Sequence, residues 1–271
     1  MENNIKFSFG NDKVAKAYDE VLVPTLFVPW ALQLIEENKP WSDKTVLDLA
    51  CGTGVVTKAL VQQVAPNGNV FALDINSQML ELAKQNCKPW ENHIEFIQGS
   101  CESLPISDAT LDAVVCQQGF QFFPNKKMAA SEIFRVLKPK GTAIISTWCP
   151  VSECEIFGIV CETLEIMNKK EISQMMRMPF DNLTQQGLRA PFEGLGFSSI
   201  KIAKQEKYLH LNSIDSALDI AYATPIGPKL KELSTVKQEE FKKLFLEKIR
   251  LLYKHNNHFG LMTTNILKAV K

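Results

Sequence analysis

Residues 45–54 read Thr45-Val46-Leu47-Asp48-Leu49-Ala50-Cys51-Gly52-Thr53-Gly54. The apolar run that begins at Thr45 is typical of a buried strand. The two glycines that follow predict a sharp turn, in which the backbone can approach a ligand closely. A helix is expected next, from about Val55 to Val64. Strand, glycine loop and helix in this order predict the first unit of a parallel sheet with helices packed on it.

The same alternation of short apolar runs and amphipathic helices continues to Thr147. Further strands are expected at residues 69–74, 93–98, 111–116 and 142–147, with helices at 77–87 and 126–136. This pattern predicts an α/β fold with a Rossmann-like sheet that is mostly parallel and has helices on both faces.

The segments on either side of this core, which spans 44–150, interrupt the alternation. Residues 1–40 are expected to form N-terminal helices, the first of which ends at Pro24. We expect 151–192 and 213–256 to form an inserted helical lid. Long strands over 199–211 and 258–270 should close one edge of the sheet as an antiparallel pair, so that 1–271 forms a single domain.

The charge balance of the chain is even, with 30 Lys and Arg against 30 Asp and Glu. Nucleic-acid-binding proteins usually carry a basic excess, so this balance favours a small-molecule partner over a nucleic acid. The N-terminus has no apolar signal sequence, and no apolar run is long enough to span a bilayer. We therefore expect a cytoplasmic protein, and the sequence does not predict its oligomeric state.

The seven cysteines are scattered along the sequence, with no C-x-x-C pair. In a chain without a secretion signal, such residues are expected to be reduced thiols. Their spacing predicts no metal site.

Polar groups follow several of the expected strands, where open parallel sheets bind their ligands. Asp74 ends the second strand and could accept hydrogen bonds from both hydroxyls of a ribose. Asp74 could instead cap the following helix, although Asn76 and Ser77 are better placed for that task. Thr57 occupies the place of the third glycine of the dinucleotide-binding pattern, which argues against a nicotinamide or flavin cofactor.

The segment from Thr45 to Thr147 resembles the core of class I S-adenosylmethionine-dependent methyltransferases. It is similar in particular to the branch of ubiquinone/menaquinone-biosynthesis C-methyltransferases. The matching pieces are Val46–Gly54, Leu73-Asp74, Gly99–Pro105 and Glu132–Gly141. The resemblance therefore implies a class I methyltransferase sheet, with S-adenosylmethionine as cofactor and S-adenosylhomocysteine as product, and it implies no metal.

The resemblance also implies which residues contact S-adenosylmethionine. Its methionine part would lie against the loop, its ribose against Asp74, and its adenine between Ile75 and Met79. The expected cofactor-binding residues are Tyr18, Ala50, Gly52, Thr53, Gly54, Asp74, Ile75, Met79, Ser100, Cys101 and Gln117. Ser100 stands where the family often has Asp, which weakens the expected recognition of the adenine. Tyr18 could cover the cofactor or could equally be a core tyrosine.

Methyl transfer from a sulfonium needs alignment of the acceptor more than it needs a nucleophile. We therefore assign no catalytic residue, although His210, His255 and His258 could serve as bases. Methionines and aromatic residues of the lid, such as Met176 and Phe180, suit a small, largely apolar acceptor such as a quinone, sterol, fatty or polyketide-like molecule. The alternative is that these residues only pack the lid.

Other functions remain open at this point. The chain could methylate RNA or protein, or it could bind S-adenosylmethionine without catalysis. A related family methylates arsenite through cysteine thiolates, but the sequence shows no thiolate cluster.

Overall fold

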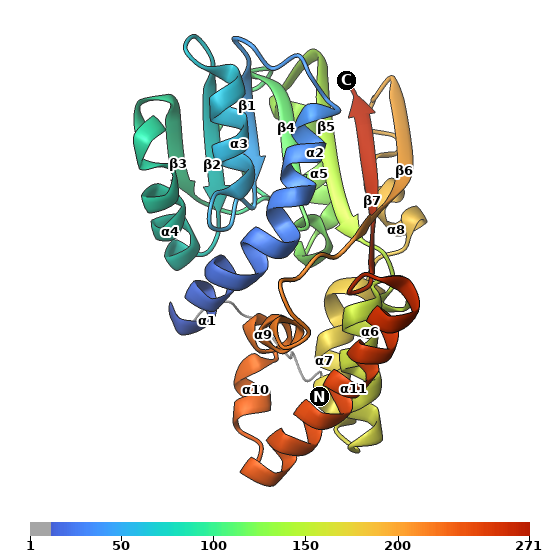
Figure 1. Cartoon of the computed structure of the whole chain (residues 1–271). Helices are drawn as coiled ribbons and strands as arrows, with labels where there is room; N and C mark the ends of the chain where they lie inside the picture. The colour runs from blue at the N-terminus through green and yellow to red at the C-terminus, as the bar shows by residue number, and fades with distance from the viewer. Residues whose placement is uncertain (1–11) are drawn as a thin grey trace. The chain divides into compact units, whose positions relative to one another are not determined.

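The computed structural model describes residues 12–271, so the first eleven residues of the expected helical segment 1–40 lie outside the described residues. The chain divides into two compact units (Figure 1). The sheet unit contains Phe27–Thr147, Leu183–Gln205 and Thr264–Lys271. The helical unit contains residues 12–26, Trp148–Asn182 and Glu206–Thr263.

A seven-stranded sheet has the strand order β3-β2-β1-β4-β5-β7-β6. The strands are β1 (Thr45–Leu49), β2 (Asn69–Asp74), β3 (Ile94–Gln98), β4 (Leu111–Gln117), β5 (Leu137–Trp148), β6 (Ser199–Tyr208) and β7 (Leu261–Val270). β1 lies at the centre of the parallel part, with Val46 beside Val70 of β2 and Ala113 of β4. The carboxyl ends of β1, β2 and β4 therefore lie at the same edge, where the expected ligand-binding residues begin.

The last strand runs antiparallel to its neighbours, which confirms the predicted mostly parallel sheet with an antiparallel terminal strand. The backbone N–H of Lys140 donates to the carbonyl of Lys271, and that of Lys271 to the carbonyl of Gly141, both at 2.9 Å. On the other side, the Ser198 N–H donates to the Val270 carbonyl at 2.7 Å. β7 thus pairs with β5 on one side and with β6 on the other, so that β6 and β7 lie at one edge of the sheet as an antiparallel pair, with β6 outermost.

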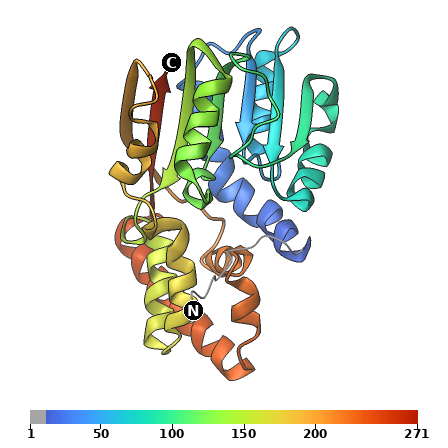
Figure 2. The same ribbon diagram turned by 180° about the vertical axis from the view of Figure 1, so that it is seen from behind.

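Helices cover both faces of the sheet unit (Figures 1 and 2). They are α2 (Val28–Glu36), α3 (Val55–Val64), α4 (Ser77–Cys87), η2 (Lys88–His93), η3 (Phe120–Phe122), α5 (Lys126–Val136), α8 (Gln185–Arg189) and η5 (Ala190–Phe192). Ala113 and Val115 of β4 pack in one core with α2 and α3, whereas Val114 packs in another core with α5. This alternation is the two-residue period of a strand that is buried on both faces.

Pro24 does not end the N-terminal helix, contrary to expectation. Helix α1 (Asp12–Ala17) continues into a π-helix, η1 (Tyr18–Phe27), which contains Pro24 and leads into α2. A proline ring clashes with the carbonyl of the preceding turn of an α-helix, and the wider π-turn relieves this clash. The hydroxyl of Thr25 donates to the Val21 carbonyl, a group that a regular helix would pair with a backbone N–H.

The helical unit contains η4 (Val151–Glu153), α6 (Glu155–Ile166), α7 (Lys170–Asp181), α9 (Ser216–Ala223), α10 (Gly227–Lys231) and α11 (Thr235–Asn256). Helix α6 packs against α7 and α11. The rings of Phe157 and Phe180 lie 5.0 Å apart, and Met176 of the methionine-rich stretch is buried. These side chains pack within the helical unit. Of the expected lid segment 151–192, the part from Leu183 onward belongs instead to the sheet unit.

Among residues 12–271, no helix is long and apolar enough to cross a membrane.

Candidate functional site

The glycine loop between β1 and α3 has an unusual backbone. Ala50, Gly52 and Gly54 have positive φ angles of 59°, 55° and 89°. A Cβ atom on Gly54 would lie 3.1 Å from the Cβ of Ala83 on α4, whereas one on Gly52 would meet no described atom within 4 Å. Gly54 therefore lets the loop pack against α4. Gly52 instead leaves backbone open to an approaching molecule, as a nucleotide-binding loop requires.

Asp74, at the end of β2, holds this loop in place. One carboxylate oxygen accepts a hydrogen bond from the Gly52 N–H at 2.8 Å, and the other accepts one from the Asn76 N–H at 2.9 Å. A carboxylate has about four lone-pair directions, so each oxygen retains acceptor capacity for a further donor. Two adjacent ribose hydroxyls are the kind of donor pair that such a carboxylate can bind.

The surroundings of Asp74 affect its charge in two opposing ways. The side chain is 9% exposed, and this burial raises the pKa of the carboxyl above its usual value. The backbone N–H groups of Asn76, Gly52 and Ile75 act in the opposite direction. The N–H groups thus stabilise the carboxylate in a place where desolvation penalises it.

Asn76, and not Asp74, caps helix α4. The Asn76 side-chain oxygen accepts hydrogen bonds from the N–H groups of Gln78 and Met79, at 2.9 and 3.2 Å. Asp74 is therefore not the N-cap of α4, a role that remained possible from the sequence.

The expected adenine-binding residues follow β2 and β3. Ile75 is 73% exposed, which is unusual for an isoleucine, whereas Met79 is buried. After β3, the Ser100 hydroxyl accepts a hydrogen bond from the Glu102 N–H at 3.2 Å, and Cys101 is buried. An exposed apolar side chain beside a buried carboxylate suits the flat ring of a nucleoside. The contacts of these four residues with adenine stay predictions.

Two further polar groups are consistent with a bound cofactor. Among residues 12–271, no group hydrogen-bonds the buried Thr53 hydroxyl or the side-chain oxygen of Gln117. The Gln117 side-chain nitrogen donates to the carbonyl of Phe27 at 2.9 Å. Buried polar atoms usually have partners, so these two atoms are ready to bind polar groups of a ligand. Together with Asp74 and the open Gly52, they fit S-adenosylmethionine.

Tyr18 and the candidate bases lie in the helical unit. Tyr18 is half-buried in η1, so its expected place over the cofactor stays a prediction. The His258 ring stacks on Tyr208 with 4.2 Å between ring centroids, and its Nδ1 accepts a hydrogen bond from the Gly260 N–H. These contacts give His258 a local structural role, and we still assign no catalytic residue.

The roles of Asn86 and Thr57 in supporting the loop were not predicted from the sequence. The Asn86 side chain donates to the Thr53 carbonyl at 3.0 Å. The Thr57 hydroxyl donates to the buried carboxyl of Asp48 at 2.5 Å. A Cβ on Gly119 would lie only 2.7 Å from the Cβ of Ala50. Gly119 follows β4 closely in the sequence, whereas Asn86 lies 33 residues from its partner, and no local pattern links the two.

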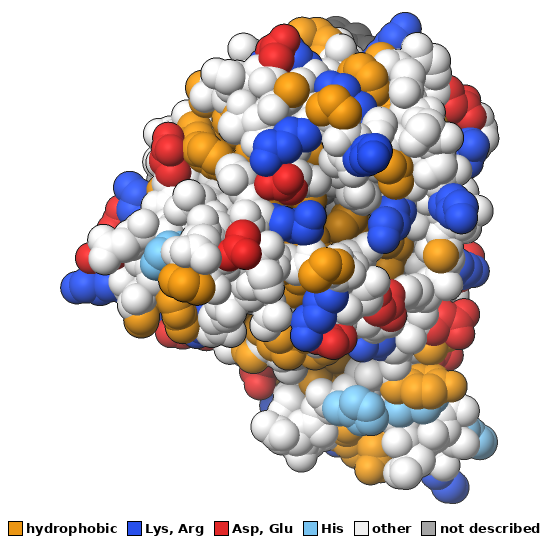
Figure 3. Space-filling view, turned by 90° about the horizontal axis from the view of Figure 1, so that it is seen from above, with side chains coloured by type: hydrophobic (Ala, Val, Ile, Leu, Met, Phe, Trp, Pro, Cys, Tyr) orange, Lys and Arg blue, Asp and Glu red, His pale blue; other side chains and the backbone are white. Residues whose placement is uncertain are grey.

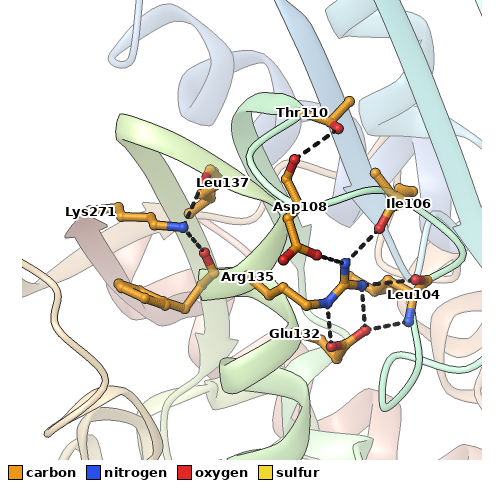
Figure 4. Close-up of polar contacts among 9 residues, drawn as sticks. Leu104, Ile106, Asp108, Thr110, Glu132, Arg135, Leu137 and Lys271 are labelled. Atoms are coloured by element: carbon orange, nitrogen blue, oxygen red, sulfur yellow. Dashed lines mark hydrogen bonds and ion pairs between the residues drawn. The ribbon is translucent and has the colours of Figure 1, made fainter.

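The segment after β3 is fixed by Arg135 of α5 (Figure 4). Its guanidinium donates to the carbonyls of Leu104 and Ile106 at 3.0 and 2.8 Å. It also pairs with the carboxylates of Glu132 and Asp108, each at 2.7 Å. Glu132 in turn accepts the Leu104 N–H at 2.7 Å. This network ties the chain that follows Cys101 to α5, and it explains why Arg and Glu occur three residues apart in the matching motif.

All seven cysteines are buried free thiols. Burial raises the pKa of Cys87 to about 12 and that of Cys101 to about 11. In the helical unit it raises the pKa of Cys154 to about 12. These groups are therefore protonated near neutral pH, which disfavours chemistry that depends on thiolates.

Residues 46–141 match the family model described as a methyltransferase domain. The fold is similar to that of phosphoethanolamine N-methyltransferase 2 from Haemonchus contortus, with a TM-score of 0.62. The sequences are 16% identical, and the comparison covers 96% of this chain and 57% of the other. The comparisons thus show a methyltransferase domain at residues 46–141 and a fold shared with methyltransferases of known structure.

The particular proteins that this chain resembles in sequence include demethylmenaquinone methyltransferases. That of Lactobacillus johnsonii is 36% identical over 126 residues, which are 45% of this chain and 52% of that protein. That of Thermotoga maritima is 34% identical over 142 residues, which are 51% of this chain and 60% of that protein. The chain spans about half the length of the curated relatives it matches.

Proposed function

We propose that this protein transfers a methyl group from S-adenosylmethionine to a small, largely apolar acceptor of the quinone class. The observation that carries the proposal is the placement of Asp74. Its buried carboxylate orients the loop through Gly52 and keeps acceptor capacity beside the exposed Ile75. The names of the similar demethylmenaquinone methyltransferases support the quinone class of acceptor.

The cofactor would supply a methyl group already activated by the positive charge of its sulfur. The residues of the chain would therefore act mainly by binding and alignment. Asp74 would bind the ribose, Ile75 and Met79 the adenine, and the backbone of Ala50, Gly52 and Gly54 the methionine part. Ser100 and Cys101 would lie beside the adenine, and Tyr18 would cover the cofactor. The buried Gln117 would exclude water and offer its side-chain oxygen to a donor.

Other acceptors have less support. The raised pKa values of the buried thiols disfavour an arsenite methyltransferase that uses thiolates. On the face drawn in Figure 3, Lys and Arg side chains are interspersed with Asp, Glu and uncharged residues. The equal numbers of basic and acidic residues likewise favour a small molecule over RNA. The cytoplasmic location and the action of the helical segments as a lid stay predictions.

The test is a turnover assay with the full chain, S-adenosylmethionine and a chemically reduced naphthoquinone. We expect S-adenosylhomocysteine to form only when the acceptor is present, and the acceptor to gain one methyl group by mass spectrometry. The variant Asp74→Asn should lower turnover, and Glu81→Gln, an exposed carboxylate on α4, should not.

Two results would contradict this proposal. Tight cofactor binding without S-adenosylhomocysteine formation, with the naphthoquinone or with a lipid extract, would favour a nonenzymatic binding protein. Label that passes from the cofactor only to RNA or protein in a cell extract would identify a macromolecular acceptor.

A further inference from the structure

Three buried polar side chains form a row at the carboxyl ends of β4 and β5. These residues are Gln117, Gln118 and Ser146, which are 9%, 5% and 3% exposed, and we call them the strand-end polar row. Gln117 lies opposite Ser146 in the parallel register of the two strands. The Gln118 N–H donates to the Ser146 carbonyl at 2.9 Å. The three residues thus occupy adjacent positions of neighbouring strands.

The amide of Gln118 has its orientation fixed by Thr264 of β7. The Thr264 hydroxyl donates its hydrogen to the Thr147 carbonyl at 2.8 Å. Its oxygen can therefore only accept from Gln118, whose side-chain nitrogen lies 2.9 Å away. A rotated amide would place two acceptors against each other. The side-chain oxygen of Gln118 must therefore lie on the side away from Thr264.

The orientation of the Gln117 amide is fixed in the same way, by a partner that can only accept a hydrogen bond. Its side-chain nitrogen donates to the Phe27 carbonyl, a group that can only accept. The side-chain nitrogens of both consecutive glutamines thus have hydrogen-bond partners. Among residues 12–271, neither side-chain oxygen has a hydrogen-bond partner, and neither does the Ser146 hydroxyl.

The unpaired atoms indicate which chemical group would satisfy them. An amide oxygen accepts hydrogen bonds and cannot donate them, so the missing group carries an O–H or N–H. The row itself contains no charged side chain, which favours a neutral group over an ion.

The three residues of the row lie at different distances from the glycine loop. Asp48 of β1 is paired with Val115, so Gln117 lies two residues further, at the level of the glycine loop. Gln118 and Ser146 lie further along the sheet, toward β5 and β7. Gln117 thus lies beside the glycine loop of β1, whereas Ser146 and the partner of Gln118, Thr264, lie on strands further from β1.

We propose that Gln118 and Ser146 bind a neutral hydroxyl group of the methyl acceptor, which donates its hydrogen to the Gln118 side-chain oxygen. Thr264 is a positioning residue, because it sets which end of the Gln118 amide faces the acceptor. This inference rests on the proposed function and specifies its substrate class: apolar molecules that carry a phenol or alcohol, as a reduced quinone does.

The test measures equilibrium binding of two matched probes, 1-naphthol and 1-methoxynaphthalene, to the full chain saturated with S-adenosylhomocysteine. The probes share an apolar ring system, and only the first has a hydroxyl hydrogen. We expect the wild-type protein to bind 1-naphthol about tenfold more tightly, the size of one buried hydrogen bond. In Gln118→Leu this ratio should fall to about one.

Two further variants control for indirect effects. Gln63→Leu makes the same change at an exposed position on α3 and should keep the wild-type ratio. Thr264→Val should lower the ratio while it leaves binding of 1-methoxynaphthalene unchanged, because the Gln118 amide can then rotate. A merely structural role of Thr264 would weaken both probes equally.

Equal binding of the two probes to the wild-type protein, absence of 1-naphthol binding, or an unchanged ratio in Gln118→Leu would each overturn the proposal. Turnover is measured separately. A hydroxyl preference that depends on Gln118, in a protein that forms no S-adenosylhomocysteine, would refute the methyltransferase function and leave a hydroxyl-binding site. Turnover without that preference would refute only the role of the row.

Discussion

The carboxylate of Asp74 accepts a hydrogen bond from the backbone N–H of Gly52 at 2.8 Å, although 22 residues separate them. The bond joins the ends of β1 and β2, two adjacent parallel strands. It makes the expected ribose-binding group and the expected methionine-binding loop one structural unit. A change at Asp74 should therefore affect both the shape of the loop and the affinity for the cofactor.

Replacement of Asp74 by Asn should weaken S-adenosylhomocysteine binding by about 10- to 100-fold, the value of one or two charge-assisted hydrogen bonds. The amide has only one accepting oxygen, so it cannot serve the Gly52 and Asn76 N–H groups and a ribose together. Isothermal titration calorimetry measures the effect, with Glu81→Gln on the exposed face of α4 as the matched control. Equal affinities of wild-type protein and Asp74→Asn would show that Asp74 does not bind the cofactor.

Gly119→Ala should destabilise the sheet unit by about 1–3 kcal/mol, the usual cost of an overpacked core. The added methyl group would lie 2.7 Å from the Ala50 Cβ and 3.1 Å from the Cys116 Sγ. Gly99→Ala is the matched control, because its nearest atom would be at 3.5 Å, an ordinary contact. Urea denaturation compares the two variants, and equal midpoints would contradict the close approach of Gly119 to Ala50.

Arg135→Met should lower the free energy of unfolding by about 2–3 kcal/mol. The variant keeps an apolar stem but loses the bonds to the Leu104 and Ile106 carbonyls and to Glu132. Lys84→Met removes an exposed cation whose partner, Glu81, lies 4.0 Å away, and it should cost less than 0.5 kcal/mol or so. If both variants unfold at the same denaturant concentration, the network in Figure 4 does not stabilise the fold.

The buried carboxyl of Asp48 should make stability fall as the pH rises from about 4 to about 7. Burial raises the pKa of Asp48 from 3.8 to about 7, and the Thr57 hydroxyl opposes this shift. In that window the unfolded chain has released the proton while the folded chain still holds it. The folded state therefore binds more protons, and its stability decreases with pH until the pKa of about 7 is passed.

The variant Asp48→Asn isolates this effect, because it cannot titrate. Its free energy of unfolding, relative to that of the wild type, should rise between pH 4 and pH 7, by an amount on the order of 3 kcal/mol. Denaturation curves at several pH values measure the difference. A constant difference across this range would mean that Asp48 is already ionised in the folded protein.

The local elements of the sheet unit were predictable from the sequence. Helix α3 begins at Val55 and ends at Val64 as expected, because a glycine with positive φ precedes it and an extended residue follows it. Asn76 was correctly identified as the better cap for α4, because capping depends on residues only two or three positions apart. These features reflect short-range sterics and hydrogen bonds, which a sequence pattern records directly.

The prediction that the N-terminal helix ends at Pro24 was wrong, and the reason is again local. The breaker rule assumes an α-helix, whereas the chain forms a π-helix at Tyr18–Phe27. The sequence predicted an antiparallel pair at one edge of the sheet, but it did not predict which of the two strands lies next to β5. The sequence pattern of β7 is compatible with an inner or an outer position in the sheet. Only its hydrogen bonds to β5 and β6 show that it is the inner strand of the two.

The sequence by itself determined the order of strands and helices, the glycine loop and the carboxylate that ends β2. It could do so because burial and backbone strain select residue types at each position. The tertiary structure alone decided which groups meet: Asn86 with Thr53, Gly119 with Ala50, and Gln118 with Thr264. Such pairs join residues far apart in the chain. Only the packing of strands and helices brings them within hydrogen-bonding or van der Waals distance.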